Sequence, residues 1–169
     1  MHAFDADLLE GNLVVRLALA DEKLVLLDGK SINLDSQDVV IADASGAIAL
    51  AGVMGGLKTA VSANTKNILL EIAHFHPTLV RKSAKRHHLH TDAGFRFERG
   101  VDVENMANAA SLAGSHLVEH CGGTWVANSE VSTGTFETRK INLNVSELNK
   151  FAGLEIPVLE IRRILGQLG

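Results

Sequence analysis

At three positions in this chain, a residue type that can bind a ligand or take part in a reaction stands in unusual sequence surroundings. His2 carries an imidazole, which ordinarily titrates near pH ~6.5 and can accept a proton or orient a water molecule. Glu71 stands inside the apolar run 67–75, where an unpaired carboxylate would cost several kcal/mol, so we expect it to have a partner or to face a cavity. Gly55-Gly56 follows an apolar run, and without side chains its backbone N–H groups can approach a ligand closely.

Each position also has a purely structural interpretation. His2 could be a surface histidine, and Gly55-Gly56 could form a hairpin corner. Glu71 could be held in an internal ion pair with Arg96 or Arg99. Gly55-Gly56 is not a phosphate-binding loop, because neither the Lys-Ser/Thr pair nor the G-x-G-x-x-G spacing is present.

The histidines raise the question of a metal. His74 and His76 are two residues apart, so on a strand they would share one face, and further histidines follow at positions 87, 88 and 90. No cluster of carboxylates or cysteines accompanies them, and we therefore predict no metal site. The single cysteine, Cys121, excludes both an internal disulfide and a zinc site made of cysteines alone.

Residues 91–100 are dense in charge and glycine. Phe95 and Phe97 alternate with Arg96 and Glu98, which predicts a strand with the two rings on one side and the charges on the other. Such a segment could be a salt-bridged strand edge. Alternatively, the small residues Thr91 and Ala93 that precede it would suit the lining of a pocket.

The overall composition limits the function. The chain has 169 residues, of which 46% are hydrophobic and 21% charged, and this balance is typical of a globular domain. A net charge of −4 argues against nucleic-acid binding by bulk electrostatics. A local basic group at 81–86 (Arg81, Lys82, Lys85 and Arg86) could contact RNA phosphates or could simply be a solvated helix face. No apolar run is long enough to span a membrane, and one cysteine fits a reducing cytoplasm.

Short runs rich in branched side chains, separated by Asp28-Gly29 and Ser45-Gly46, predict hairpins. We expect strands at 13–16, 24–27, 38–43, 47–53, 67–75, 124–133 and 138–145, with 67–75 buried on both faces. Pro77 suits the first turn of a helix that continues to residue 88. Three- and four-residue spacing of apolar side chains predicts a second helix at about 103–120, ended by Gly122-Gly123, and two shorter helices from Ser146 and Pro157. We expect one domain at 1–136 and the truncated beginning of another at 137–169.

Six ordered motifs together resemble the beta subunit of bacterial phenylalanine–tRNA ligase. They are His-Ala-Phe-Asp, Leu-Leu-Asp-Gly, Val-Ile-Ala-Asp, Ala-Gly-Val-Met-Gly-Gly, Asn-Ile-Leu-Leu-Glu and His-Thr-Asp-Ala-x-x-Arg-Phe-Glu-Arg-Gly-Val-Asp. The similarity covers the central editing module at 1–136 and continues more weakly into 137–169. It implies an α+β fold, a mostly antiparallel β-sandwich of mixed topology with flanking helices in three layers, followed by the start of a small second domain.

The resemblance also implies an activity, namely hydrolysis of tyrosine wrongly attached to tRNA(Phe). His2 falls on the histidine of the family's site, and Gly55 on the glycine whose backbone approaches the amino-acid ring. Glu71 falls on the carboxylate that recognises the tyrosine hydroxyl, and Thr91 and Ala93 fall on small residues that line the pocket. The chain departs from the family at Gly94, where many relatives have serine.

The resemblance further implies partners outside this chain. They are the alpha subunit, in a heterotetramer of two alpha and two beta chains, and tRNA(Phe), with no membrane involved. ATP and magnesium would serve the whole cytoplasmic enzyme, and we expect no cofactor on this piece. We also expect the isolated piece to be weakly active or inactive. A non-catalytic RNA-binding or scaffold module of the synthetase is the alternative function.

Overall fold

The computed structural model describes residues 1–132, 134 and 140–168. The chain divides into two compact units, Met1–Trp125 and Val126–Gly169. The domain boundary predicted between 136 and 137 falls on residues outside the described ones and stays a prediction.

The strands of the first unit pair in antiparallel sheets. A four-stranded sheet has the order β2-β5-β6-β7, and two further sheets are the pairs β1-β8 and β3-β4. The strands are β1 (His2–Asp5), β2 (Val14–Leu17), β3 (Lys23–Val25), β4 (Ser31–Asn33), β5 (Val39–Asp43), β6 (Gly46–Leu50), β7 (Met54–Gly55) and β8 (Ile68–Glu71), with a 3-10 helix η1 (Ala6–Leu8) after β1. Single bridges from Phe4 to Ala60 and from Leu26 to Gly56 add further backbone pairing.

Both predicted hairpins are present, because their turn residues satisfy the local backbone. In the turn from β3 to β4, Asp28 accepts a hydrogen bond from the Lys30 N–H at 2.9 Å. In the turn from β5 to β6, the Asp43 carboxylate accepts from the N–H and hydroxyl of Ser45 at 2.8 and 2.6 Å. These turns set the register of the strands on either side.

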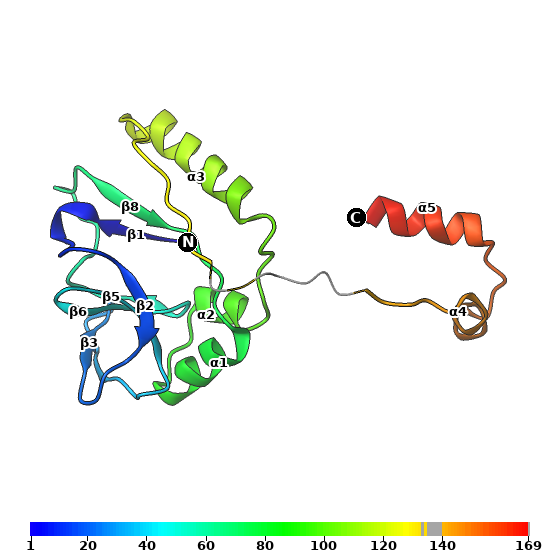
Figure 1. The fold of residues 1–169 in the computed structure, drawn as a ribbon, viewed down its shortest axis with the longest axis horizontal. Coiled ribbons are helices and arrows are strands. Elements are labelled where there is room, and N and C mark those ends of the chain that lie inside the picture. The colour runs from blue at the N-terminus through cyan, green and yellow to red at the C-terminus, as the bar shows by residue number, and fades with distance from the viewer. Residues whose placement is uncertain (133, 135–139, 169) are drawn as a thin grey trace. The chain divides into compact units, whose positions relative to one another are not determined.

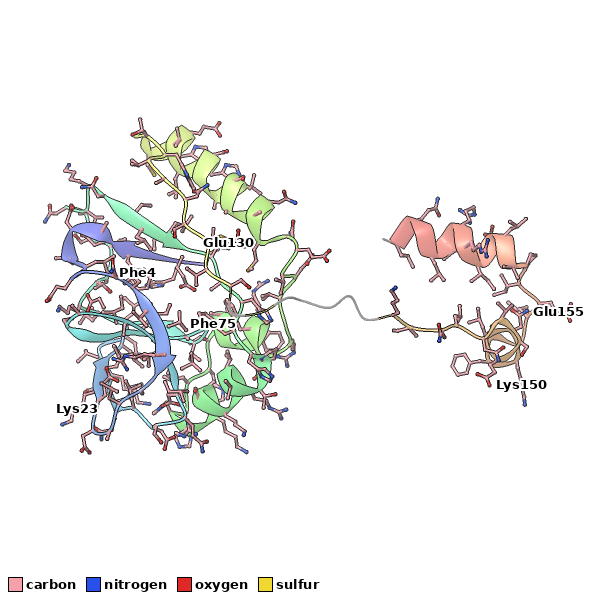
Figure 2. All side chains as sticks on the ribbon, in the orientation of Figure 1. Phe4, Lys23, Phe75, Glu130, Lys150 and Glu155 are labelled. Atoms are coloured by element: carbon pink, nitrogen blue, oxygen red, sulfur yellow. The ribbon has the colours of Figure 1, made fainter. Side chains whose placement is uncertain are left out.

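One hydrophobic core joins the sheets of the first unit to two of its helices, Pro77–Arg86 and Asp92–Phe97. Figure 1 shows these two helices beside the sheets. Figure 2 shows Phe4 of β1, which is fully buried in the same core as residues of β5 and β6. Helix α1 (Pro77–Arg86) packs against β5 and against α2 (Asp92–Phe97), and contributes Val80 to the core. The predicted α+β fold with antiparallel sheets and flanking helices is confirmed.

Two predictions around the middle of the chain are wrong. The strand expected at 67–75 ends at Glu71, and its residues are exposed or half-buried rather than buried on both faces. The segment after Thr91 is the helix α2 and not a strand. Thr91 caps this helix by accepting a hydrogen bond from the Gly94 N–H at 2.9 Å, and helical spacing buries Phe97 while Phe95 stays exposed.

The longest helix is α3 (Met106–Cys121), and it confirms the helix predicted at about 103–120. It ends at Gly122, whose φ of 72° lies in the region that favours glycine. The strands expected at 124–133 and 138–145 are absent from their described residues, and residues 133 and 135–139 lie outside the description.

The second unit contains α4 (Val145–Ala152) and α5 (Val158–Leu168), which confirms both predicted short helices (Figure 2). Asn144 caps α4 by accepting a hydrogen bond from the Ser146 N–H at 3.0 Å. Within the described residues, no helix is both long enough and apolar enough to cross a lipid bilayer.

Candidate functional site

The pairing of β1 with β8 brings together the two residues that the sequence analysis singled out first. His2 lies directly opposite Glu71 in the antiparallel register. Directly opposite residues project from the same face of a sheet, and Phe4, two residues after His2, shares that face. The His2 ring meets the Phe4 ring edge-on at 4.5 Å between centroids. The side chains of His2 and Glu71 therefore project from the same face of the β1-β8 pair as the side chain of Phe4, which is buried in the core.

Gly55 of β7 lies against the His2 ring. A Cβ atom at this position would stand 2.5 Å from His2 Nε2 and 3.1 Å from Nδ1, far inside ordinary contact. Any side chain at Gly55 would therefore displace the imidazole. This close approach, which joins β7 to the β1-β8 pair, is a stronger reason for the glycine than the hairpin corner considered from sequence.

The surroundings of His2 keep its imidazole neutral. Burial lowers the pKa of His2, and the positive amino group of residue 1 lowers it further. Its Nε2 atom is buried and has no hydrogen-bond partner among the residues that the structure describes. A neutral imidazole with an unsatisfied nitrogen can bind a water molecule or a polar group of a ligand.

Glu71 is a carboxyl group that prefers its proton more than usual. Burial raises the pKa of Glu71, and the amino group of residue 1 opposes that rise only in part. The ion-pair alternative is not what the structure shows. Arg99 binds Glu98 at 2.6 Å and covers the Phe95 ring at 3.5 Å, and no ion pair within the described residues joins Glu71 to any cation, Arg96 included.

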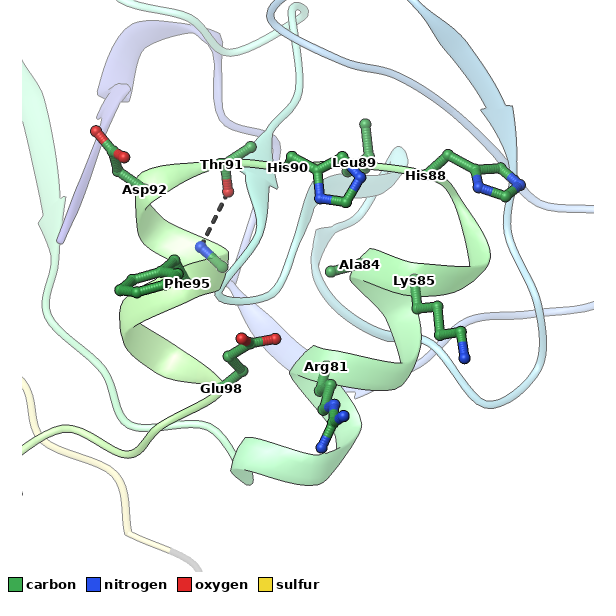
Figure 3. Close-up of a pocket in the computed structure, with 11 residues that line it drawn as sticks. Arg81, Ala84, Lys85, His88, Leu89, His90, Thr91, Asp92, Phe95 and Glu98 are labelled. Carbon is green, nitrogen blue, oxygen red and sulfur yellow. Dashed lines mark hydrogen bonds between the residues drawn. The ribbon is translucent and has the colours of Figure 1, made fainter.

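Thr91 and Ala93 lie on α2 rather than on the β1-β8 pair. The Thr91 hydroxyl donates a hydrogen bond to the Val53 carbonyl at 2.8 Å, which ties the start of α2 to the turn before Gly55. Thr91 also lines a cavity of about 410 Å³ between α1 and α2 (Figure 3). Ala93 is exposed on the first turn of α2. That cavity is not lined by His2 or Glu71. The structure brings His2, Gly55 and Glu71 together and ties Thr91 to Val53, near Gly55, whereas no contact among the described residues joins Ala93 to this group.

A buried carboxylate that the sequence analysis missed organises the side of the sheet next to α1. Asp38 is fully buried and accepts hydrogen bonds from Ser83 at 2.7 Å, from the Asp35 N–H at 2.9 Å and from Arg86, and it contacts His87 Nε2 at 2.5 Å. Burial by itself would raise the pKa of Asp38. The hydrogen bonds from the Asp35 backbone, His87 and Ser83 outweigh it and lower that pKa. Arg86, one member of the basic group at 81–86, therefore has its charge balanced by the Asp38 carboxylate.

The histidine pair first considered as metal ligands does not lie on a strand. Strand β8 ends before His74, and His76 precedes α1, so the shared strand face expected for this pair does not exist. Within the described residues, the one group of three potential ligands that converges is His116, Glu119 and His120 on α3. The signal that could have found it is the four-residue spacing of the two histidines within a predicted helix.

A comparison with known protein families matches residues 1–122 to the B3/4 domain. The chain belongs to the B3/4 domain family. This B3/4 domain chain is 44% identical over 171 residues to the phenylalanine–tRNA ligase beta subunit of Vibrio cholerae, a match that covers 100% of the chain and 22% of the relative.

Other relatives carry the same name. The beta subunit of Fusobacterium nucleatum is 42% identical over 99% of the chain, and that of Neisseria gonorrhoeae is 38% identical over 100%. The chain spans about a fifth of the length of these curated relatives, 21% and 22% respectively. The resemblance inferred from the six motifs is confirmed.

Proposed function

We propose that this B3/4 domain removes tyrosine from mischarged tyrosyl-tRNA(Phe), as part of a phenylalanine–tRNA ligase beta subunit. The observation that carries the proposal is the Glu71 carboxyl. It lies directly opposite His2 on one face of the β1-β8 pair, and no ion pair among the described residues occupies it. A half-buried carboxyl with no ion-pair partner among the described residues is available to a ligand.

Selection between the two amino acids depends on a single oxygen. A hydrophobic pocket that binds phenylalanine rejects an added hydroxyl by only about 10². A second site that hydrogen-bonds the hydroxyl selects tyrosine and rejects phenylalanine. Phenylalanine would leave the Glu71 carboxyl unpaired, at a cost of about 1–3 kcal/mol. The phenol hydroxyl both donates and accepts, so it can pair with Glu71 in either protonation state. Glu71 thus serves to recognise the side chain of tyrosine.

Hydrolysis needs a water molecule near the ester and a group that can take part of its proton. In this proposal the neutral His2 ring holds that water through its unsatisfied Nε2 atom. Gly55 permits the close position of the ring, since any Cβ there would displace it. The aminoacyl ester is already activated, so no covalent intermediate on the protein is required. Thr91 and Ala93 would border the amino-acid side.

The remaining parts of the proposal concern the complete enzyme. Its partners would be the alpha subunit, in a heterotetramer of two alpha and two beta chains, and tRNA(Phe), and it would work in the cytoplasm. ATP and magnesium would serve the complete enzyme. The converging ligand group among the described residues contains two imidazoles, whereas magnesium prefers oxygen ligands.

The test is made in a complete phenylalanine–tRNA ligase whose beta subunit carries this sequence. With Glu71→Ala, we expect tyrosyl-tRNA(Phe) to accumulate during aminoacylation with tyrosine, while phenylalanine attachment stays unchanged. Glu104→Ala removes an exposed carboxylate elsewhere and serves as the matched control. If the Glu71→Ala enzyme clears tyrosyl-tRNA at the same rate as the control, the role of Glu71 is refuted.

The same assay separates His2 from Glu71. We expect His2→Ala to slow deacylation of preformed tyrosyl-tRNA with a smaller loss of discrimination against phenylalanyl-tRNA. If rate and discrimination fall together, His2 only shapes the pocket. If neither variant changes deacylation, the scaffold alternative is favoured.

A second candidate function, RNA contact without catalysis, is supported by the cavity between α1 and α2. Figure 3 shows Arg81 and Lys85 projecting from α1 at its edge, and His88 and His90 also line it. These side chains could meet RNA phosphates. If they do, tRNA binding should weaken in Arg81→Ala and fall steeply with salt. Binding that is unaffected by both would leave this face as an ordinary solvated surface.

A further inference from the structure

The last two turns of α3 carry three metal-binding residue types on one side of the helix. His116, Glu119 and His120 are spaced i, i+3 and i+4, which places them next to one another on an α-helix. All three are exposed, with 57% of the His116 side chain and 69% of the Glu119 side chain accessible. Nothing in the proposed editing reaction uses them.

Their atoms are already close to the arrangement that a single ion requires. One potential ligand atom from each residue lies within 4.8 Å of the other two. His116 Nδ1 stands 3.9 Å from Glu119 Oε2, and the His116 and His120 rings stack at 5.7 Å with an angle of 6° between their planes. Tetrahedral zinc with bonds of about 2.0–2.1 Å separates its ligand atoms by about 3.4 Å. Small side-chain rotations, with no change in the helix backbone, would therefore close the site.

The helix itself favours a cation at this place. Helix α3 ends at Cys121, so the three ligands lie on one side of its last turns, where unpaired carbonyl groups carry partial negative charge. The helix is also packed near this end, because the Trp125 ring lies against Gly114 so closely that a Cβ there would overlap it. An ion bound by His116 and His120 would join two successive turns of a helix that already exists.

We propose that His116, Glu119 and His120 form a binding site for a late first-row divalent cation, of which Zn²⁺ is the representative. Two imidazoles and one carboxylate suit Zn²⁺, Cu²⁺ and Ni²⁺ and are poor ligands for Mg²⁺ or Ca²⁺. Three protein ligands leave at least one coordination position for water. The site is separate from His2 and Glu71, and it goes beyond the sequence prediction of no metal, which considered the histidines between positions 74 and 90.

The test is a calorimetric titration of the 169-residue chain with Zn²⁺, with Mg²⁺ as a parallel titrant. We expect one Zn²⁺ per chain at micromolar affinity and no heat of binding with Mg²⁺. His120→Gln should weaken Zn²⁺ binding by at least about tenfold. Glu119→Gln should weaken it less, because the imidazole pair remains. The matched control His76→Gln removes an exposed histidine elsewhere and should leave the affinity unchanged.

A second readout locates the ion. Cu²⁺ is paramagnetic, and at substoichiometric amounts it should broaden the NMR signals of the His116 and His120 rings before those of the other histidines. The far-ultraviolet circular dichroism of each variant should match that of the unsubstituted chain, because the replaced side chains are exposed. The proposal is overturned if His120→Gln binds Zn²⁺ as tightly as the unsubstituted chain, or if His76→Gln weakens binding as much.

Discussion

Alanine at two adjacent glycines tests the contact between β7 and His2. The three atoms nearest to a Cβ at Gly55 would all belong to the imidazole of His2, which lies at the end of a side chain that can rotate. A Cβ at Gly56 would stand 2.5 Å from the backbone oxygen of Ile48 and 3.0 Å from Leu24 Cδ1. The Ile48 oxygen accepts the Gly56 N–H at 2.7 Å, so it cannot withdraw without losing that hydrogen bond.

The two substitutions should therefore differ in their free energy of unfolding. For Gly56→Ala, overpacking costs about 1–3 kcal/mol and the hydrogen bond about 1 kcal/mol. The lower entropy of the unfolded alanine chain offsets about 0.4–1 kcal/mol, which leaves a net loss of about 1–3.6 kcal/mol with a central value of about 2 kcal/mol. For Gly55→Ala the ring moves instead, so the net change in stability should stay within about 1 kcal/mol. The moved ring should lose its burial, and the pKa of His2 should rise toward 6.5.

Urea unfolding followed by tryptophan fluorescence measures the first quantity, since Trp125 is the chain's single tryptophan and lies in the first unit. With a urea dependence near 2 kcal/mol per molar, Gly56→Ala should lower the midpoint by about 1 M, and Gly55→Ala by at most about half as much. NMR titration of the His2 ring measures the second. Equal loss of stability in both variants, with the pKa of His2 unchanged in Gly55→Ala, would refute the placement of His2 over Gly55.

Two further predictions concern the carboxyl groups of Asp38, which is fully buried, and Glu71, which is half-buried. Asp38→Asn should lower the free energy of unfolding at pH 7 by about 3 kcal/mol, because it leaves buried polar partners without their anion. Since folding lowers the pKa of Asp38, its contribution is present above pH 3.8 and is lost as the pH falls through the lower folded value, so urea midpoints of variant and parent should converge in acid. For Glu71 the pH dependence of the free energy of unfolding has the opposite sign. Folding raises its pKa, the folded state holds the proton more tightly, and stability should fall as the pH rises above 4.5. Glu71→Gln should remove that fall in urea titrations between pH 4 and 8, and an unchanged pH profile would contradict the burial of this carboxyl.

The candidate site was partly accessible from sequence. Glu71 could be singled out because a carboxylate within an apolar run needs a partner or a ligand. The pairing of His2 with Glu71 could not be predicted, because the 68 residues between them leave the pairing of β1 with β8 unspecified until the sheet forms. Asp38 gave no local signal, since its partners Ser83, Arg86 and His87 come from a helix far along the chain.

Local chemistry decided several elements by itself. Pro77 at the start of α1, and apolar residues at three- and four-residue spacing in α3, predicted those helices because their causes lie within a few residues. In the segment after Thr91, alternation of Phe95 and Phe97 predicted a strand, but the Thr91 cap and the burial of Phe97 in the shared core produced a helix. The core that the whole domain buries determines which of two local patterns prevails. It also determines which distant side chains meet. Only the tertiary structure could decide these points, because burial is a property of the assembled chain.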